Sequence, residues 1–504
     1  MHRFFEAMEK SGLELYINSL VKKLAQTKGE DDFYSAFLEI INRMMPLAGE
    51  NKGVLETVKR AFERRIPMTQ VARLLVQDRL SERVREKLAD NFFVSWIMDA
   101  RKRNKLKTEH FKAPWFFVIS PTFACNLRCY GCYAHEYQRG QGMSFETFDR
   151  IIREAERLGI RFLTISGGEP FFWRDLEAGK NLLDIAARHK GVFFQVYTNG
   201  TFLTEPKTVE RLAEVGNIAP AISQEGFAEE TNERRGKCII NRKEEWVWDA
   251  IQKAREELYS AGVLQGFSVT ATRQNSDVIT SNKFIESLID QNVSFGWFFT
   301  YIPIGREPKI ELMQTPRQRL EMGKAIWKWR AEKPIFIGDF WNDGPWVGGC
   351  IAGGRRYFHI NALGDIEPCV FAHFATDNIY RLWENGKGLK EAITSPFFHL
   401  IREKQLEIGN WLSPCCIIDH PNILREAVRV SRAYPTHKGA ETVIGGEIAQ
   451  FLIEYGEKVQ EITKDAFEKM EGGGWDTEAT ELSKIIRNHR ARNIEEYNLM
   501  FNTR

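Results

Sequence analysis

The chain has 504 residues, 43% hydrophobic and 27% charged, a balance typical of globular proteins and a length that suggests about two to four domains. Its formal net charge of +2 gives no overall electrostatic reason to bind nucleic acid, so we expect no nucleic-acid partner. Eight cysteines in so long a chain do not make a disulfide framework. No apolar run of about 18 residues and no signal-peptide core occur, so we expect a cytoplasmic protein.

Four regions follow one another along the chain. Residues 1–112 carry apolar residues at helical spacing, which predicts an all-helical N-terminal domain. Residues 113–340 alternate short apolar runs with amphipathic stretches. Residues 341–425 are rich in loops and contain a second group of cysteines, and residues 426–504 are predicted to be a helical C-terminal segment.

The second region predicts the fold. Its apolar runs are expected to form six strands, at 115–120, 161–166, 192–198, 219–223, 266–272 and 294–302. Strands that alternate with helices form a parallel sheet or an open barrel, in which ligands bind at the C-terminal ends of the strands. The fold class is therefore predicted to be α/β: a partial (β/α)6 barrel with a helical N-terminal domain and a cysteine-containing C-terminal extension.

Three cysteines follow the first predicted strand with the spacing Cys-x3-Cys-x2-Cys: Cys125, Cys129 and Cys132. Thiolates spaced this closely can hold three irons of a cubane cluster and leave the fourth iron open to a small molecule. The alternative is a zinc site, although structural zinc normally takes four protein ligands.

A second motif, Ser-Gly-Gly-Glu-Pro, ends the second predicted strand at residues 166–170. Gly167 and Gly168 allow backbone to approach a ligand closely, and Glu169 can accept hydrogen bonds from an ammonium group. With the cysteine triad, this motif resembles the radical S-adenosylmethionine (radical SAM) superfamily. The resemblance implies a [4Fe–4S] cluster on the triad and binding of the methionine amine by Gly167, Gly168, Glu169 and Pro170.

The resemblance also implies a reaction and a partner. An electron from the cluster cleaves S-adenosylmethionine, and the resulting 5′-deoxyadenosyl radical abstracts a substrate hydrogen; the electron donor is expected to be a ferredoxin or flavodoxin. One position departs from the superfamily pattern. The residue before the third cysteine is usually aromatic, whereas here it is Gly131, with Tyr130 one residue earlier.

Further cofactor contacts are expected at the ends of other predicted strands. Thr198 and Asn199 are candidates for the ribose or the methionine carboxylate, and Ser223 is a similar candidate. Arg235 resembles a basic residue near the methionine carboxylate in related enzymes, and residues 301–305 correspond to backbone that contacts adenine. The alternative for each is an ordinary turn residue.

The second cysteine group has the spacing Cys-x13-Gly-x4-Cys, with Cys350, Gly364 and Cys369. It resembles the opening of the SPASM and twitch extensions, which hold auxiliary [4Fe–4S] clusters. Gly364 is expected to make a hairpin turn that brings both thiolates together.

We expect a single auxiliary cluster, because few cysteines remain. Its predicted ligands are Cys350, Cys369 and Cys415, with the adjacent Cys416 a weaker candidate. The fourth iron is left open or bound by His373 or His420. The alternative is a set of buried structural thiols, which is also how we interpret the isolated Cys238.

A lipid is the leading substrate prediction. Apolar residues 92–98 precede a basic cluster at 101–107, a combination that suits the surface of an anionic membrane, although a core helix with a solvated end is the alternative. Residues 338–360 and 414–421 are also similar to bacterial radical SAM proteins proposed to join lipid alkyl chains. We therefore expect C–C coupling of alkyl chains and a peripheral membrane contact.

Three alternatives to a lipid-modifying enzyme remain open: an enzyme that acts on a peptide, an enzyme that acts on a small molecule, and a protein without enzymatic activity. Many enzymes with SPASM-type extensions modify ribosomally made peptides, but their N-terminal recognition fold contains a β hairpin that residues 1–112 do not predict. The second alternative is a small metabolite or tetrapyrrole as the substrate. The third is a non-enzymatic iron–sulfur protein. The candidate catalytic residues are Asp339 and Asp343, in an aromatic and polar stretch with Trp341 and Asn342, where a structured linker is the alternative.

Overall fold

The computed structural model describes residues 15–47, 52–91, 99, 102–103, 105–107, 112–134 and 142–471. The apolar segment 92–98 of the predicted membrane contact lies outside the described residues, and so does the end of the predicted C-terminal segment, 472–504. No described helix is both long enough and apolar enough to cross a membrane.

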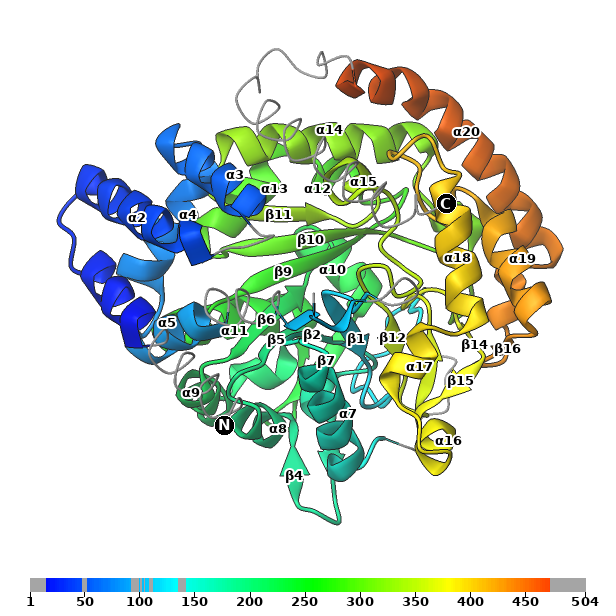
Figure 1. Cartoon of the computed structure of the whole chain (residues 1–504), viewed down its shortest axis with the longest axis horizontal. Helices are drawn as coiled ribbons and strands as arrows, with labels where there is room; N and C mark the ends of the chain where they lie inside the picture. The colour runs from blue at the N-terminus through cyan, green and yellow to red at the C-terminus, as the bar shows by residue number, and fades with distance from the viewer. Residues whose placement is uncertain are drawn as a thin grey trace.

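A ten-stranded sheet in the order β11-β10-β9-β6-β5-β2-β1-β12-β13-β15 forms the centre of the protein (Figure 1). Its first seven strands are parallel: β1 (Phe116–Ile119), β2 (Phe162–Ile165), β5 (Phe193–Thr198), β6 (Ile218–Ser223), β9 (Gly266–Ala271), β10 (Phe295–Thr300) and β11 (Phe336–Asp339). All six predicted strands are present, and the α/β class with a mostly parallel sheet is confirmed. The sequence prediction missed β11, a four-residue strand at the edge of the sheet.

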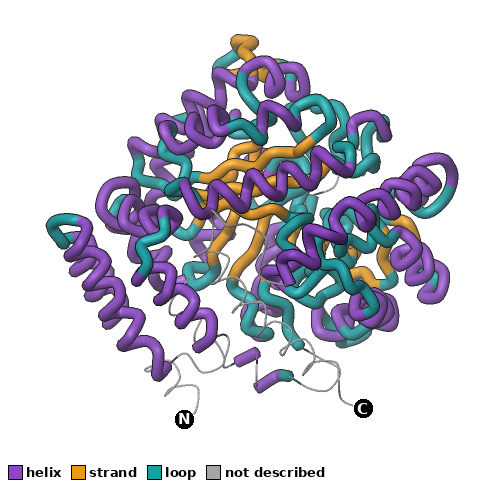
Figure 2. The backbone as a smooth tube through the Cα atoms, turned by 90° about the horizontal axis from the view of Figure 1, so that it is seen from above, coloured by secondary structure: helices purple, strands orange, loops and turns teal. Residues whose placement is uncertain are grey.

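Helices cover the strands on the outside of the sheet (Figure 2). The longer ones are α7 (Phe145–Arg157), α8 (Leu182–Arg188), α9 (Pro206–Val215), α10 (Ala228–Arg235), α11 (Val247–Ser260), α13 (Asn282–Asp290) and α14 (Pro316–Glu332). Helix α7 illustrates why they pack there. Its residues Phe148, Ile151, Ile152 and Ala155 form one fully buried stripe at helical spacing, and Arg153 is exposed on the other face.

Every regular element among the described residues before position 91 is helical, and the predicted helical domain over 1–112 stays a prediction. The main helices are α2 (Glu30–Met44), α3 (Lys52–Glu63), α4 (Gln70–Leu74) and α5 (Glu82–Ala89), on the left of Figure 1. Leu80 and Val84 pack against Phe193, Ala219 and Leu264, which lie at the beginnings of strands. The segment that contains Leu80 and Val84 therefore packs against the N-terminal ends of strands β5, β6 and β9.

The region around the second cysteine group extends the same sheet. Strand β12 (His359–Ile360) pairs in parallel with β1, and β13 (Asp365–Glu367) returns antiparallel to β12. The turn contains Gly364 with a φ of 84°, so the predicted hairpin is confirmed. Beyond it lie α16 (Ile379–Glu384), α17 (Leu389–Ile393), α18 (Pro396–Leu406), α19 (Pro421–Ser431) and α20 (Gly446–Glu471), on the right of Figure 1.

The close packing between neighbouring strands of the sheet can be tested at Gly296 in β10. A Cβ added at Gly296 would overlap the ring of Phe267 on β9, so Gly296→Ala should destabilise the fold by about 1–3 kcal/mol and lower the Tm. Gly409→Ala is the matched control, because an added Cβ there meets no atom within 4 Å. Equal Tm values for the two variants in thermal unfolding would contradict this packing.

Candidate functional site

One cavity of about 530 Å³ is lined by both cysteine groups and by residues from most of the parallel strands. The triad Cys125, Cys129 and Cys132 contributes to its wall, and so do Cys350, Cys369, Cys415 and Cys416. Two cysteine groups more than 200 residues apart in sequence therefore share a single chamber. This juxtaposition follows from the pairing of β12 with β1, which the triad loop directly follows.

The glycines after β2 support the triad loop. The Gly168 N–H donates to Thr122 O (2.9 Å), and the Glu169 N–H donates to Ala124 O (2.9 Å). A Cβ at Gly167 or Gly168 would overlap these carbonyl oxygens, and Gly167 has a φ of 110°. The two glycines therefore permit a close approach of the cysteine-loop backbone, and both also line the cavity, where their contact with a ligand stays a prediction.

The carboxylate of Glu169 is buried and engaged by neighbouring donors. It accepts hydrogen bonds from Thr198 Oγ1 (2.7 Å), Asn199 N (2.8 Å) and Phe171 N (3.1 Å). Burial outweighs these bonds and raises the pKa of Glu169 to about 7. Neither Glu169 nor Pro170 is among the described residues that line the cavity. Glu169 therefore connects the end of β2 to the end of β5.

Thr198, Asn199, Ser223 and Arg235 all line the cavity. The Asn199 Nδ2 group donates to Asn126 Oδ1 (2.8 Å) and lies 3.9 Å from Cys125 Sγ, so it links β5 to the triad loop. Ser223 Oγ lies 3.0 Å from Ser268 Oγ. Arg235 forms a buried ion pair with Glu225, and its positive charge partly offsets the effect of burial on the Cys129 thiol.

The triad thiols lie in surroundings that disfavour a thiolate without a bound cation. Burial raises the pKa of Cys125 to about 12 and also raises the pKa of Cys129. Iron can replace the thiol proton in such a place, since ligation requires the thiolate form. Within the described ranges, no three Cys, His, Asp or Glu side chains converge on a single-ion site. Ligands of a cubane bind separate irons, so the triad fits a cluster better than zinc.

Two residues after β10 hold the triad loop in place, and sequence reasoning did not identify either role. Arg306 donates from Nη1 to Cys129 O (2.8 Å) and from its backbone N–H to Cys132 O (3.0 Å). The ring of Tyr301 lies over Gly131, where an added Cβ would be 2.9 Å from Tyr301 Cε2. An aromatic side chain at position 131 would therefore collide with Tyr301, which accounts for the departure from the superfamily pattern.

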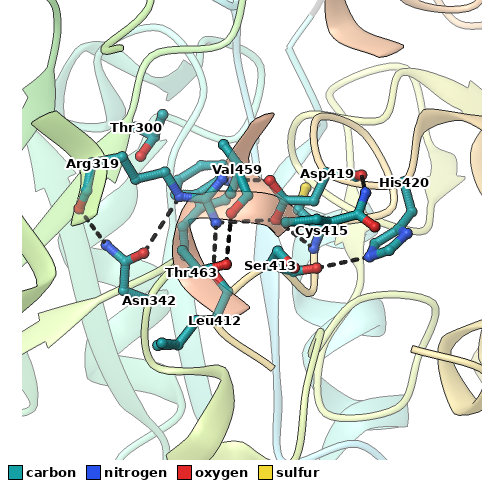
Figure 3. Close-up of polar contacts among 12 residues, drawn as sticks. Thr300, Arg319, Asn342, Leu412, Ser413, Cys415, Asp419, His420, Val459 and Thr463 are labelled. Atoms are coloured by element: carbon teal, nitrogen blue, oxygen red, sulfur yellow. Dashed lines mark hydrogen bonds and ion pairs between the residues drawn. The ribbon is translucent and has the colours of Figure 1, made fainter. Parts of the chain in front are cut away.

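The second cysteine group is held by a buried ion pair. Arg319 on α14 donates to both carboxylate oxygens of Asp419, and Asp419 Oδ2 accepts from the Cys415 N–H (2.9 Å). Figure 3 shows Arg319 between Asn342 and Asp419, with Cys415 on the far side of the carboxylate. The barrel thereby fixes the loop that carries Cys415.

Asp339 and Asp343, the two candidate catalytic residues, both line the cavity, and their carboxylates accept hydrogen bonds from neighbouring groups. Asp339 accepts from the N–H groups of Trp341 (3.1 Å) and Asn342 (3.0 Å) and from Asn342 Nδ2 (2.8 Å). Burial, with a smaller effect from Asp343, raises its pKa to about 6. Asp343 receives two hydrogen bonds from Arg330, at 2.8 and 2.7 Å. These contacts stabilise the turn after β11.

Two described members of the predicted membrane-binding basic cluster are used inside the fold. Lys102 Nζ donates to Glu156 O (2.7 Å), and Arg103 Nη1 donates to Gly159 O (2.7 Å). Burial lowers the pKa of Arg103. Both cations therefore bind carbonyl oxygens at the C-terminal end of α7, a favourable place for positive charge, which weakens the argument for a membrane contact here.

Comparison with known proteins identifies the family. The family model described as "Radical SAM superfamily" matches residues 119–266. Mycofactocin maturase MftC from Mycolicibacterium smegmatis is 30% identical over 308 residues, covering 55% of this chain and 72% of that protein. The chain belongs to the radical SAM superfamily. A crystal structure of Streptococcus suis SuiB bound to S-adenosylmethionine has a similar fold, with a TM-score of 0.50, 20% identity, and coverage of 72% of this chain and 84% of that one.

Membership of the radical SAM superfamily confirms that the protein is an enzyme and confirms the predicted cofactors, S-adenosylmethionine and [4Fe–4S] clusters. It also excludes the non-enzymatic alternative. The triad fits the radical SAM cluster, and the second group supplies four more thiols for an auxiliary cluster.

The contact between Gly131 and Tyr301 gives a prediction for cluster loading. Gly131→Tyr should lower the iron bound after anaerobic reconstitution, because the new ring would collide with Tyr301 and because Gly131 has a φ of 61°. The double variant Gly131→Tyr/Tyr301→Ala should recover part of the loss. Full loading of the single variant would show that Tyr301 does not restrict this position.

Glu169 should affect cofactor binding through the turn that it holds. In Glu169→Gln an amide NH₂ would replace one of two oxygens that both accept hydrogen bonds, so the Thr198–Asn199 turn should loosen. We expect the KM for S-adenosylmethionine to rise by about 10-fold or more. Glu177→Gln, at an exposed position, is the control and should leave the KM unchanged. An unchanged KM in Glu169→Gln would refute the positioning role.

Proposed function

We propose that this radical SAM enzyme abstracts hydrogen from an unactivated C–H of an apolar substrate, and that the substrate is a lipid alkyl chain whose carbon is then coupled to another. When bound, the triad cluster and S-adenosylmethionine supply the 5′-deoxyadenosyl radical. The chain's own residues orient the substrate and exclude water from it. The aromatic lining of the cavity is the observation that carries this proposal.

The region between the two cysteine groups is a wall of aromatic rings. Tyr133 follows Cys132, and its ring lies 5.2 Å from that of Phe371. Phe371 in turn lies 5.3 Å from Trp341, and Phe299 lies 5.3 Å from Phe340. Such a wall offers few hydrogen-bonding partners to a peptide backbone and favours burial of a hydrocarbon.

The apolar lining continues along the strands. Trp297 lies within β10, and Phe116, Phe162 and Phe336 are the first residues of their strands; all four line the same cavity. The Trp297 indole N–H, one of the polar groups here, donates to Gln195 Oε1 (3.2 Å). The cavity is therefore elongated in the strand direction, from the triad towards the helical N-terminal region. An extended alkyl chain suits such a shape.

Peptide modification is the second candidate, and the relatives favour it. The mycofactocin maturases match this chain over about 55–58% of its length. A maturase acts on a precursor, and the second cysteine group agrees with a SPASM-type enzyme.

Residue roles follow from position around the cavity. Gly167, Gly168, Thr198, Asn199 and Ser223 are proposed to contact S-adenosylmethionine beside the triad, with Arg235 as the cation for its carboxylate. Glu169 and Pro170 are proposed to act by holding that wall. Asp339 and Asp343 are proposed to shape the substrate end of the cavity. A ferredoxin or flavodoxin as electron donor and a peripheral membrane contact remain predictions.

Deuterium transfer distinguishes lipid from peptide. The anaerobically reconstituted enzyme is incubated with S-adenosylmethionine and a chemical reductant, and with either vesicles of perdeuterated-acyl phospholipid or a deuterated peptide pool. We expect deuterium in 5′-deoxyadenosine only with the lipid. The triple variant Cys125→Ala/Cys129→Ala/Cys132→Ala should form no 5′-deoxyadenosine, and Cys238→Ala should behave as wild type. Transfer from the peptides alone would establish the second candidate.

A further inference from the structure

We propose that Cys416 is the fourth ligand of the auxiliary cluster, so that Cys350, Cys369, Cys415 and Cys416 form a closed set of thiolates with no iron left open. This changes the prediction made from the sequence, in which three cysteines were the ligands and the fourth iron was open or bound by a histidine. The proposal concerns the second cysteine group and does not depend on whether the substrate is a lipid or a peptide.

The four thiols converge on one wall of the cavity from three separate segments. Cys350 precedes β12, Cys369 follows β13, and Cys415 and Cys416 precede α19. The side chains of Cys350 and Cys416 are hydrogen-bond partners. Cys416 is thus joined to one member of the predicted three-cysteine set and lines the same cavity as the other two.

The histidines that could have completed the set are turned to other partners. His373 places Nδ1 2.6 Å from His437 Nε2 and Nε2 2.9 Å from Val370 O. His420 places Nε2 2.9 Å from Ser413 O, as Figure 3 also shows. Neither histidine is among the described residues that line the cavity, whereas Cys416 is. Cys416 is therefore better placed than either histidine.

Adjacent ligands require a backbone that directs two successive side chains to one side. The turn at 415–419 carries both cysteines and is held from several directions. The N–H groups of Asp419 and His420 both donate to Cys415 O, at 3.0 and 2.9 Å, and the Cys415 N–H is bound by Asp419, which Arg319 fixes in turn. The Cys415 and Cys416 side chains both line the cavity from this turn.

The sulfur atoms also receive the hydrogen bonds that ligating thiolates take. Tyr357 Oη lies 2.7 Å from Cys369 Sγ, the Phe371 N–H is 3.5 Å from the same sulfur, and the Ile417 N–H is 3.4 Å from Cys415 Sγ. Hydrogen bonds to sulfur are among the factors that set cluster potentials. Four thiolates leave no coordination position for substrate, so this group differs in kind from the triad, where three thiolates leave one.

The experiment isolates the auxiliary cluster by placing variants in the full chain that carries Cys125→Ala/Cys129→Ala/Cys132→Ala. This background should bind about four irons after anaerobic reconstitution. Adding Cys416→Ala should open one iron, which appears as partial iron loss or as the electron paramagnetic resonance (EPR) signal of a three-iron cluster after mild oxidation. The controls His373→Gln, His420→Asn and Cys238→Ala should keep four irons and an unchanged spectrum. A spectrum unaffected by Cys416→Ala, or lost in a histidine variant, overturns the proposal.

A second measurement needs no change in the auxiliary group. Cyanide added to the reduced triad-free protein should leave the EPR spectrum unchanged, because every iron already has a thiolate ligand. A cyanide-dependent shift would show an open iron and would overturn the closed set even if Cys416→Ala failed to fold. If that variant folds, it should gain the cyanide-dependent shift that the background lacks.

Discussion

The contact on which the site depends is the seating of the triad loop on two glycines. Gly167 and Gly168 leave room for the carbonyl groups of Thr122 and Ala124, and the backbone at 168 and 169 donates to those carbonyls. Any side chain there would push the loop away and separate the three thiols from the strand ends where the cofactor is proposed to bind. The glycine motif is therefore a structural requirement of the cysteine motif, which explains why the two occur one strand apart.

The second constraint is the continuity of the sheet from barrel to auxiliary region. Because β12 pairs with β1, the hairpin that carries Cys369 is part of the sheet that positions the triad. The buried Arg319–Asp419 pair then fixes the remaining cysteines to α14. Removing either partner would leave an uncompensated buried charge, which is more damaging than the pair itself is stabilising. The geometry between the two cysteine groups is thus determined by the barrel.

Features encoded by neighbouring residues could be predicted from the sequence. The triad, the Gly-Gly-Glu-Pro turn, the six predicted strands and the Gly364 hairpin all depend on spacing within a short segment. Strand β11 was missed because its apolar residues Phe336 and Ile337 are followed at once by Gly338 and Asp339, which end the apolar run. Arg319 and Asp419 are 100 residues apart, and Arg306 contacts Cys129 across 177 residues, so neither contact has a local signal. The role of Glu169 was also hidden, because sequence shows the carboxylate but not the three donors around it.

The shape of the cavity wall depends on large side chains on one strand that pack against glycines on the neighbouring strands. Gly266 and Gly338 lie beside the rings of Phe295 and Trp297, so large side chains on β10 fit against glycines on β9 and β11. The Trp297 ring, set against Gly338, lines the cavity. Aromatic C–H bonds are stronger than alkyl C–H bonds, so the phenylalanine rings of this wall donate hydrogen to a radical less readily than an alkyl carbon does. The glycines of the adjacent strands make room for this aromatic lining.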